Sequence, residues 1–352
     1  MRLLFSGKRL IYIIIGVYII LLILIVYVEK NQSEASIGNI FDAFWYSIVT
    51  LCAVGYGDYY PVTLFGKILS LLLVLGSLLV LGFLIGNVTN KIMQYMEKKK
   101  FGLLGTDMKK HIIIIGWDKF GKQVIDEIIK ADHKVAIITE NKKDIDLITD
   151  LYSSSDVFPL FCDFNNWEAL KNANIDKASI VFVNFNDDTE TLVYIINLKK
   201  QFLNLEFIVS LNNADLKDTF LELGIRYALA KNEIASKLVA SYIFEPDVAI
   251  FTENFMSTAI KEYDYDIQEY RIIEENPYVG KDYMDAFIDM KTSYDSVLIG
   301  ISKTENNKRF LLKNPAKGIR IETNDYLIIM ANGISKKKIE QAFKVKEGRL
   351  LD

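Results

Sequence analysis

The sequence predicts a chain of two parts. The first is an α-helical membrane part with two spans and a re-entrant loop; the second is a Rossmann-type, doubly wound α/β domain with a small α+β subdomain after it. Leu10–Val28 (19 residues) and Ile68–Val88 (21 residues) contain no charge, and each is long enough to cross a hydrocarbon core of roughly 30 Å as a helix. From Lys109 onward, short apolar runs alternate with amphipathic segments, which is typical of a strand–helix protein.

The net charge also differs between the two predicted parts. Residues 1–100 contain nine Lys/Arg and five Asp/Glu, a net charge of 9 − 5 = +4, so the remainder has 41 − 9 = 32 basic and 45 − 5 = 40 acidic residues, a net charge of −8. Basic residues precede the first span and follow the second (Arg2, Lys8, Arg9; Lys91, Lys98, Lys99, Lys100). The positive-inside rule therefore predicts a multi-pass protein of the cell membrane with both termini in the cytoplasm. The acidic soluble part argues against nucleic-acid binding.

The first span predicts an outer helix over 10–28, and it is too long to be a cleaved signal. A shorter apolar segment follows within residues 40–58, and it predicts a re-entrant pore helix that ends in the run Ala53-Val54-Gly55-Tyr56-Gly57-Asp58. Two glycines separated by one residue let alternate residues adopt backbone angles that other residues adopt only with strain. Successive carbonyls can then point the same way and replace the hydration shell of an ion, about eight oxygens for K⁺.

Val54-Gly55-Tyr56-Gly57, continued by Asp58 and Pro61, resembles the selectivity filter of potassium channels. The resemblance implies a homotetramer around the ion axis, with K⁺ bound by the backbone carbonyls of a short run of filter residues (Ala53, Val54, Gly55, Tyr56). The family usually has threonine where this chain has Ala53, so the innermost ion site loses four hydroxyl ligands per tetramer.

Three further residues are candidates for bracing the filter. The resemblance places Trp45, Tyr46 and Asp58 behind it, where the indole N–H of Trp45 could donate to Asp58. The other interpretation of Trp45 is an aromatic residue of the membrane interface. Both interpretations remain open at this stage.

The second long span predicts an inner helix over 66–94. Glycine in a helix interior costs roughly 1 kcal/mol relative to alanine, so the three glycines of this span need a reason (Gly76, Gly82, Gly86). Resemblance to ligand-gated channels suggests Gly76 as a gating hinge, and close helix packing is an equal alternative. Packing is favoured for the other two glycines.

Residues 1–96 thus predict a pore domain, and the charged, glycine-bearing stretch 97–107 predicts a linker. Five strands separated by helices predict a Rossmann domain over 108–245, and a C-terminal subdomain is expected over 246–352. Their order resembles the RCK (TrkA-N plus TrkA-C) module that regulates potassium transport. The resemblance implies a ring of modules, eight in the usual case, of which four copies of this chain supply four.

A regulatory ligand site is expected at the first strand–helix turn. Glycines of the dinucleotide-binding pattern stand at Gly116 and Gly121, but the middle position is Asp118, whose carboxylate would repel a pyrophosphate. Glu140 stands where an acid binds ribose hydroxyls, and Asp163 ends the third strand. We expect no tight NAD binding and an N-cap role for Asp118. A nucleotide or a divalent cation remains a candidate ligand.

Calcium-gated relatives carry carboxylates at positions that match neutral residues here (Asn184, Ser210, Asn212), so calcium gating through that site is not expected. The sequence therefore predicts a ligand-regulated potassium channel and no enzyme. The alternatives are a non-conducting, membrane-anchored sensor of potassium or nucleotide, and a membrane-anchored Rossmann oxidoreductase. The intact filter argues against both, and Asp118 further disfavours the oxidoreductase.

Overall fold

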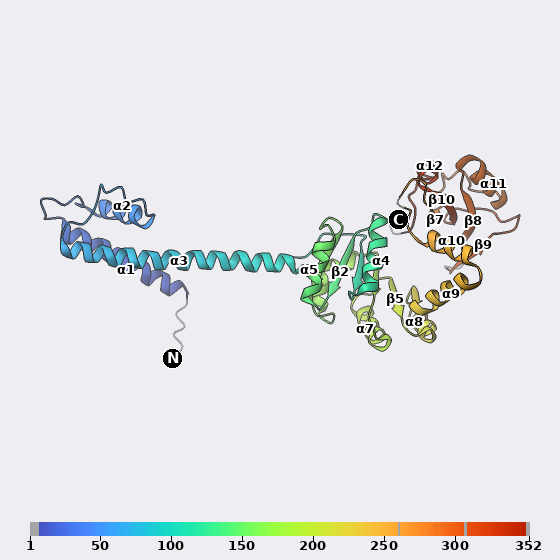
Figure 1. The fold of residues 1–352 in the computed structure, drawn as a ribbon, viewed down its shortest axis with the longest axis horizontal. Helices are drawn as coiled ribbons and strands as arrows, with labels where there is room; N and C mark the ends of the chain where they lie inside the picture. Colours follow the sequence, from blue (N-terminus) through green and yellow to red (C-terminus); the bar gives the residue numbers. More distant parts are fainter. Residues whose placement is uncertain (1–6, 260, 306–307, 350–352) are drawn as a thin grey trace. The chain divides into compact units, whose positions relative to one another are not determined.

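The computed structural model describes residues 7–259, 261–305 and 308–349. By its internal contacts the chain divides into two units, Met1–Glu97 and Lys98–Asp352, both drawn in Figure 1. Each unit is described here by itself.

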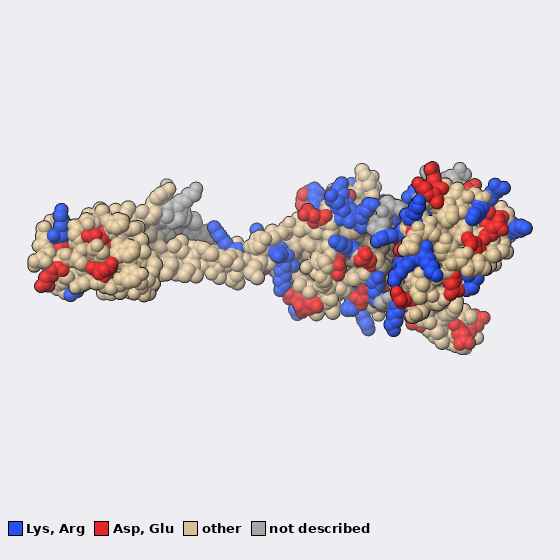
Figure 2. Space-filling view, turned by 90° about the horizontal axis from the view of Figure 1, so that it is seen from above, with Lys and Arg blue, Asp and Glu red and all other residues tan. Residues whose placement is uncertain are grey.

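The first unit is built from three helices, α1 (Gly7–Glu29), α2 (Ile40–Leu51) and α3 (Leu64–Lys100). Within the described residues, two helical stretches are long and apolar enough to cross a membrane, Tyr12–Glu29 and Leu64–Lys100. Figure 2 shows that uncharged surface covers most of this helical unit. The predicted pair of spans with a shorter helix between them is confirmed.

Glu29, the last residue of α1, ties that helix to the beginning of α3. Its carboxylate is fully buried and accepts hydrogen bonds from the backbone N–H of Val62 (2.9 Å) and Thr63 (3.0 Å) and from the Thr63 hydroxyl (2.5 Å). The N-terminus of a helix carries unpaired N–H groups and favours negative charge. A Cβ on Gly66 would lie 2.0 Å from the Glu29 Oε1, so only glycine leaves room for the carboxylate.

The second unit contains a six-stranded parallel sheet in the order β3-β2-β1-β4-β5-β6. The strands are four or five residues long and alternate with helices, as expected of a doubly wound fold. The strands are β1 (Ile112–Ile115), β2 (Val135–Thr139), β3 (Val157–Phe161), β4 (Ile180–Val183), β5 (Phe207–Leu211) and β6 (Tyr227–Ala230); the main helices are α4 (Lys119–Lys130), α5 (Lys142–Leu151), α6 (Trp167–Leu170), α7 (Asp188–Gln201) and α8 (Lys217–Glu222). The Rossmann-type prediction is confirmed, except that β6 was not foreseen because it is short and begins with an exposed tyrosine.

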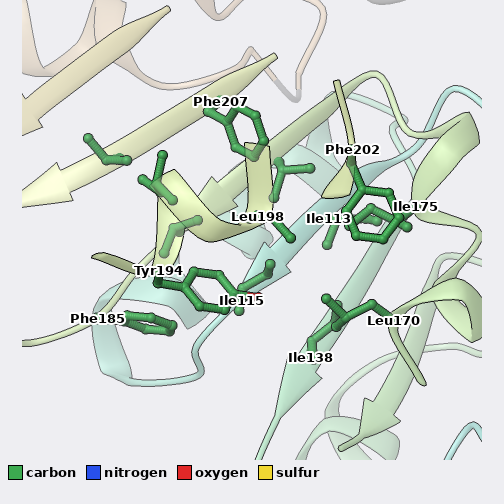
Figure 3. Packing of buried hydrophobic residues seen from close by; sticks show 14 of the residues in the cluster. Ile113, Ile115, Ile138, Leu170, Ile175, Phe185, Tyr194, Leu198, Phe202 and Phe207 are labelled. Carbon is green, nitrogen blue, oxygen red and sulfur yellow. The ribbon is translucent and has the colours of Figure 1, made fainter. Parts of the chain in front are cut away.

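The burial of the central strand β1 explains why helices cover both faces of the six-stranded sheet. All four of its isoleucines are buried, which requires cover on both faces of the sheet. Ile113 and Ile115 pack with Tyr194 and Leu198 of α7 in one cluster, drawn in Figure 3. Ile112 and Ile114 join the opposite cluster, which receives side chains from α4 and α5.

The C-terminal part begins with two short helices, α9 (Lys231–Phe244) and α10 (Pro246–Met256). A four-stranded antiparallel sheet follows in the order β7-β10-β8-β9. Its strands are β7 (Tyr265–Arg271), β8 (Val297–Glu305), β9 (Lys308–Lys313) and β10 (Tyr326–Asn332), accompanied by α11 (Tyr283–Tyr294) and α12 (Gly333–Phe343). Buried tyrosines and Phe343 form a separate core for this sheet, which agrees with the expected small α+β subdomain.

The segment expected as a linker is largely ordered. Glu97–Lys100 form the last turn of α3, and the next residues pack on the edge strand β3. The Phe161 amide donates to the Phe101 carbonyl (3.0 Å), and the two rings lie 5.4 Å apart. Gly102 has a φ of 71°, and a Cβ there would lie 2.3 Å from the Pro159 carbonyl oxygen. An apolar contact and a close approach of the backbone therefore hold the stretch that was predicted as a linker against β3.

We predict that the Rossmann domain loses stability below about pH 6.5, the usual pKa of histidine. His111 is buried and donates Nε2–H to the Ala173 carbonyl (2.8 Å), and burial lowers its pKa. The unfolded chain then takes up a proton first, so the free energy of unfolding falls from pH 6.5 down to the lowered pKa and is level below it.

The measurement is the melting temperature of the purified full-length chain between pH 7.5 and 5. His111→Gln keeps a donor for the Ala173 carbonyl but cannot titrate, so it should flatten the pH dependence. The pKa of His133 is also lowered by burial, and His133→Gln serves as the matched control for the second histidine. If the melting temperature of His111→Gln depends on pH as that of the wild type does, His111 is not the group responsible.

Candidate functional site

Left-handed backbone alternates along the predicted filter. The φ angles are 53° at Ala53, 60° at Gly55 and 76° at Gly57. No atom lies within 4 Å of a Cβ built on either glycine, so the glycines are needed for conformation and not for space. The alternation predicted from the spacing is present, and it extends one step further, to Ala53.

Ala53 is the strained member of this series. A non-glycine residue in the left-handed region costs roughly 1–2 kcal/mol, and the cost rises for β-branched side chains such as threonine. Alanine has the smallest side chain that still carries a Cβ. Alanine in place of threonine at position 53 therefore lowers the backbone strain there, besides removing a hydroxyl.

The amide groups of the filter turn back toward the end of α2. The Val54 and Gly55 amides both donate to the Val49 carbonyl, at 3.0 and 3.3 Å, and the Ala53 amide donates to Thr50 (3.1 Å). The last carbonyls of a helix have no partner within the helix, so the filter satisfies them. In the described part of the chain, no backbone amide donates to a carbonyl of residues 53–57, so these carbonyls are available to ligate an ion.

Trp45 lies behind the filter. Its indole N–H donates to the Asp58 carboxylate (2.9 Å), one of the two interpretations of this residue, and its ring stacks on Tyr56 with centroids 6.4 Å apart and planes 6° apart. Tyr46 instead packs among side chains of α1 and α3. The contacts of Trp45 suit a brace of the filter, and those of Tyr46 suit anchoring of α2.

Gly76 lies in the middle of the uninterrupted helix α3. No atom comes within 4 Å of a Cβ placed there, so within one chain close packing does not explain this glycine. It lines an apolar cleft of about 560 Å³ between α1 and α3. The hinge role stays a prediction.

In the regulator, Gly116 and Asp118 shape the turn between β1 and α4. Gly116 has a φ of 96°, and a Cβ there would lie 2.5 Å from the Asn184 carbonyl oxygen. Asp118 is the N-cap of α4, since its carboxylate accepts from the Gly121 amide (2.6 Å). The chain's own carboxylate therefore occupies the helix terminus where a phosphate would bind.

A polar network continues from Asp118 across the sheet. Asn184 donates to the Asp118 carboxylate (2.7 Å). The Asn184 side-chain oxygen accepts from the Ser210 hydroxyl (2.8 Å) and from the Lys231 ammonium (2.9 Å). Lys231 also lies 4.5 Å from the Phe120 ring centre. The Lys231 ammonium thus lies beside Asn184, one of the residues predicted to match the calcium site of relatives. No sequence signal indicated this contact.

The third of those positions lies apart from this network. The Asn212 amide donates to the Asp188 carboxylate (2.9 Å), and its side chain donates to the Asn186 carbonyl (2.6 Å). In the described part of the chain, no group of three His, Cys, Asp or Glu residues has metal-binding geometry.

A cavity of about 520 Å³ opens near the carboxyl ends of the strands. Three acids (Glu140, Asp187, Glu190) and three aromatic residues (Phe164, Phe185, Tyr194) line it, together with Asn165, Thr189, Val193 and Asn197. Glu140 accepts from the Phe164 amide (2.7 Å), and Asp163 accepts from the Asn165 amide (2.7 Å). Of the predicted ligand residues, Glu140 lines this cavity, whereas Gly116, Asp118, Gly121 and Asp163 do not.

The aromatic wall of this cavity was not foreseen from the sequence. The rings of Phe164 and Phe185 stack with centroids 5.0 Å apart, but their positions 21 residues apart give no local signal. Next to the cavity, burial raises the pKa of the Cys162 thiol to about 12, so this cysteine is not a reactive thiolate.

Comparison with known proteins gives two family matches. An ion channel family model matches residues 10–94, and the TrkA-N domain model matches residues 112–231. The first match lies within the first unit, and the second covers the six-stranded domain of the second unit.

Two relatives match over nearly their whole length. The calcium-gated potassium channel TvoK of Thermoplasma volcanium is 24% identical over 330 residues, 90% of this chain and 88% of the relative. Potassium channel protein 1 of Methanocaldococcus jannaschii is 24% identical over 336 residues, 94% of this chain and 96% of the relative.

Among solved structures, the human SLO3 gating ring aligns with 66% of this chain and 46% of its own, at 13% identity and a TM-score of 0.50. The GsuK channel bound to NAD aligns with 97% of this chain, which spans 59% of the GsuK chain, at 12% identity and a TM-score of 0.43. The gating-ring alignment supports the fold of the soluble unit. The chain therefore carries an ion channel domain followed by a TrkA-N domain, and over most of its length it is similar to these two potassium channels.

Proposed function

We propose that this chain forms a homotetrameric channel that conducts K⁺ passively and is regulated by a ligand bound to its cytosolic domains. The observation that carries the proposal is the alternating left-handed backbone at residues 53, 55 and 57, which is the conformation a carbonyl-lined filter requires. One chain supplies one strand of carbonyls, so four copies close the ring.

The channel lies in the cell membrane with both termini in the cytoplasm, because basic residues flank the two spans on that side. Regulatory domains then meet cytosolic ligands. Binding shifts the ring between two shapes, and α3 transmits the change to the pore. Gly76 is the proposed hinge of this motion.

A nucleotide is the better of the two proposed ligand classes. The carboxyl-edge cavity has a size suited to a small ligand, aromatic rings to contact a base, and Glu140 as an acceptor for ribose hydroxyls. Because the Asp118 carboxylate caps α4, the phosphates of such a ligand would lie elsewhere than at that helix terminus. A thermal-shift screen of the full-length chain with nucleotides and divalent cations would identify the class.

The function itself is tested by potassium flux into proteoliposomes that contain the purified chain. A flux of K⁺ that exceeds the flux of Na⁺ by orders of magnitude is expected. Gly55→Ala is the matched control, because it puts a Cβ on a residue with a φ of 60° and should abolish flux. Equal fluxes of K⁺ and Na⁺ would overturn the selectivity, and a K⁺ flux no larger than that of Gly55→Ala would overturn the proposal and favour the non-conducting sensor.

We predict that Ala53→Ser tightens block by Ba²⁺, an ion close to K⁺ in size, by at least about threefold. Serine restores a hydroxyl at the innermost ion site without β-branching. Ala53→Thr restores the same hydroxyl but puts a β-branched residue at a φ of 53°, so its tetramer should melt at a lower temperature than that of Ala53→Ser.

Ala53→Gly is the control, because it removes the Cβ and adds no hydroxyl. Single-channel recordings in a Ba²⁺ titration measure the block, and differential scanning fluorimetry measures stability. An identical Ba²⁺ affinity in wild type, Ala53→Ser and Ala53→Thr would show that no ion site reaches position 53.

We predict that millimolar calcium does not change the open probability by binding at Asn184. The Lys231 ammonium already supplies a positive charge there. A triple variant with acids (Asn184→Asp, Ser210→Asp, Asn212→Asp) should stay insensitive while Lys231 is present. The same triple variant with Lys231→Gln added should respond to calcium, because its carboxylate oxygens would then have no ammonium group beside them and could bind the cation.

Planar-bilayer recordings in a calcium titration measure the response. Lys231→Gln in the otherwise wild-type chain is the control for loss of the ammonium alone. Steep opening of the wild type by calcium, lost in Asn184→Ala, would reverse this assignment.

The ring of eight modules that the resemblance implies needs four modules besides those of the tetramer. We propose that these four are shorter chains whose translation starts at Met108. Translation from that codon would give a soluble chain of 352 − 107 = 245 residues. The shorter chain would lose the contact of Phe101 with Phe161 but keep the whole six-stranded core. Pairing of tetramers through their regulators, or a separately encoded module, is the alternative source.

The full gene with Met108→Leu, a change that preserves apolar volume, should give a complex without the smaller band on a denaturing gel and without ligand gating. Native mass spectrometry of the wild type provides the stoichiometry. If the wild type contains the 40.3 kDa chain alone, the internal start is wrong.

A further inference from the structure

β3 is an edge strand of the six-stranded sheet, and the end of α3 lies against it. The strand stands first in the order of the sheet, so only one of its sides pairs with another strand. A free edge exposes backbone N–H groups that need partners. The groups that cover this edge therefore show how firmly the chain after α3 is held.

The backbone of β3 is satisfied along its open edge. The Cys162 amide, just after the strand, donates to β2 (3.1 Å). The backbone groups of successive residues point to opposite sides of a strand, so Phe161, Pro159 and Val157 turn theirs to the open edge. Val157 donates to a carbonyl before the strand (3.0 Å), and Phe161 donates to the Phe101 carbonyl (3.0 Å); proline has no N–H. Phe101, the residue after α3, thus fills the remaining position of the edge.

Side chains hold the same contact. The rings of Phe101 and Phe161 lie 5.4 Å apart, and the Lys142 ammonium lies 5.0 and 5.4 Å from the two ring centres. One turn further along α5, Asp146 pairs with Lys100 (2.5 Å), the last residue of α3. Aromatic pairs and cations over their faces add stability beyond buried area, whereas an exposed ion pair adds little. Phe101 is therefore the main anchor.

The end of α3 is itself capped where it meets the sheet. The Leu103 amide donates to the Lys98 carbonyl (2.9 Å), as in a Schellman motif. The Gly102 amide supplies the second bond of that motif, to the Lys99 carbonyl (3.1 Å). Gly102 is also the residue that approaches the Pro159 carbonyl too closely for a Cβ. Helix, cap and sheet edge are thus joined by backbone hydrogen bonds at successive residues.

The chain becomes exposed directly after this contact. Leu103 and Leu104 are 40% and 50% exposed. The chain returns to the domain at Thr106, whose amide donates to the Asn172 carbonyl (2.9 Å). Two routes therefore connect α3 to the Rossmann domain: the direct contact at Phe101, and the covalent chain through the two exposed leucines.

We propose that Phe101 and the edge of β3 form a fixed joint, through which a movement of the Rossmann domain displaces the end of α3 directly. The proposal rests on the proposed function, in which the regulator acts on the pore through α3. Phe101 is a positioning residue, because it acts through its contacts with Phe161 and Lys142. A flexible connector would transmit tension alone, and its effect would depend on its length. A joint transmits displacement in both directions, and the length of the chain after it has no effect.

Single-channel K⁺ currents of the full-length protein in planar bilayers test the proposal without a ligand, because the resting open probability depends on the coupling of regulator and pore. Gly-Ser-Gly-Ser inserted between Leu103 and Leu104 slackens the covalent route and leaves the joint. The open probability should stay within about twofold of wild type. Phe101→Ala in the insertion variant removes both routes and should change the open probability at least about tenfold, since four such contacts act in a tetramer. Phe101→Ala alone keeps the covalent route and should have a smaller effect.

Two further variants carry the same insertion as controls. Phe101→Tyr keeps the ring and should behave like the insertion alone. Tyr152→Ala breaks another aromatic pair of the domain, with Trp117 at 6.3 Å between centroids, and should leave the open probability of the insertion variant within about twofold. Differential scanning fluorimetry compares the melting temperatures, which separates loss of the joint from a general loss of stability.

Two results would overturn the proposal. If the insertion alone changes the open probability as strongly as the insertion with Phe101→Ala, the covalent chain carries the coupling. If all variants have the open probability of the wild type, no coupling passes through the joint. A wild type without K⁺ current is a different result, and it would overturn the proposed function on which the joint depends.

Discussion

The conformation of the predicted filter depends on hydrogen bonds from its amide groups to the end of α2. In this chain the Val49 carbonyl accepts from two filter amides, so the end of α2 positions the filter directly. The position of α2 depends in turn on its neighbours: the Tyr18 hydroxyl of α1 lies 2.5 Å from the Ser47 hydroxyl, and Trp45 donates to Asp58. The two spans thus serve as scaffold for a segment of five residues whose conformation is strained at Ala53.

Local signals predicted most of the first unit. Uninterrupted apolar length predicted both spans, and the spacing of Gly55 and Gly57 predicted the alternating backbone. The bond from Trp45 to Asp58 was one of two interpretations that the sequence left open. The left-handed angle at Ala53 was not predicted, because alanine gives no sign of it. The contact between Glu29 and Thr63 was also missed, since an acid at the end of an apolar helix is equally well explained as a residue in water.

In the regulator, the strands and the Asp118 cap were predictable because periodicity and capping are read within a few residues. The groups that join distant strands were not. Lys231 reaches Asn184 from 47 residues away, and the four arginines that line one cavity (Arg226, Arg271, Arg309, Arg349) come from distant parts of the sequence. The sheet gives its two edges different chemistry: acids and aromatic rings surround a cavity near the carboxyl ends, and guanidinium groups line the amino edge.

The buried contact at Glu29 has a mechanical consequence for α3. Its 37 residues make a rod of about 55 Å at 1.5 Å per residue, and the Glu29 carboxylate holds it at the Leu64 end. A rod fixed at one end moves most at the other, so a tilt of about 5° carries the Lys100 end through roughly 5 Å, given that length. Gly66 leaves no room for a methyl group beside the carboxylate, so lack of space requires glycine at the fixed end, whereas the φ angles require it in the filter. A displacement at the Lys100 end therefore reaches the residues next to the predicted filter only along the length of α3, within which Gly76 is the proposed hinge.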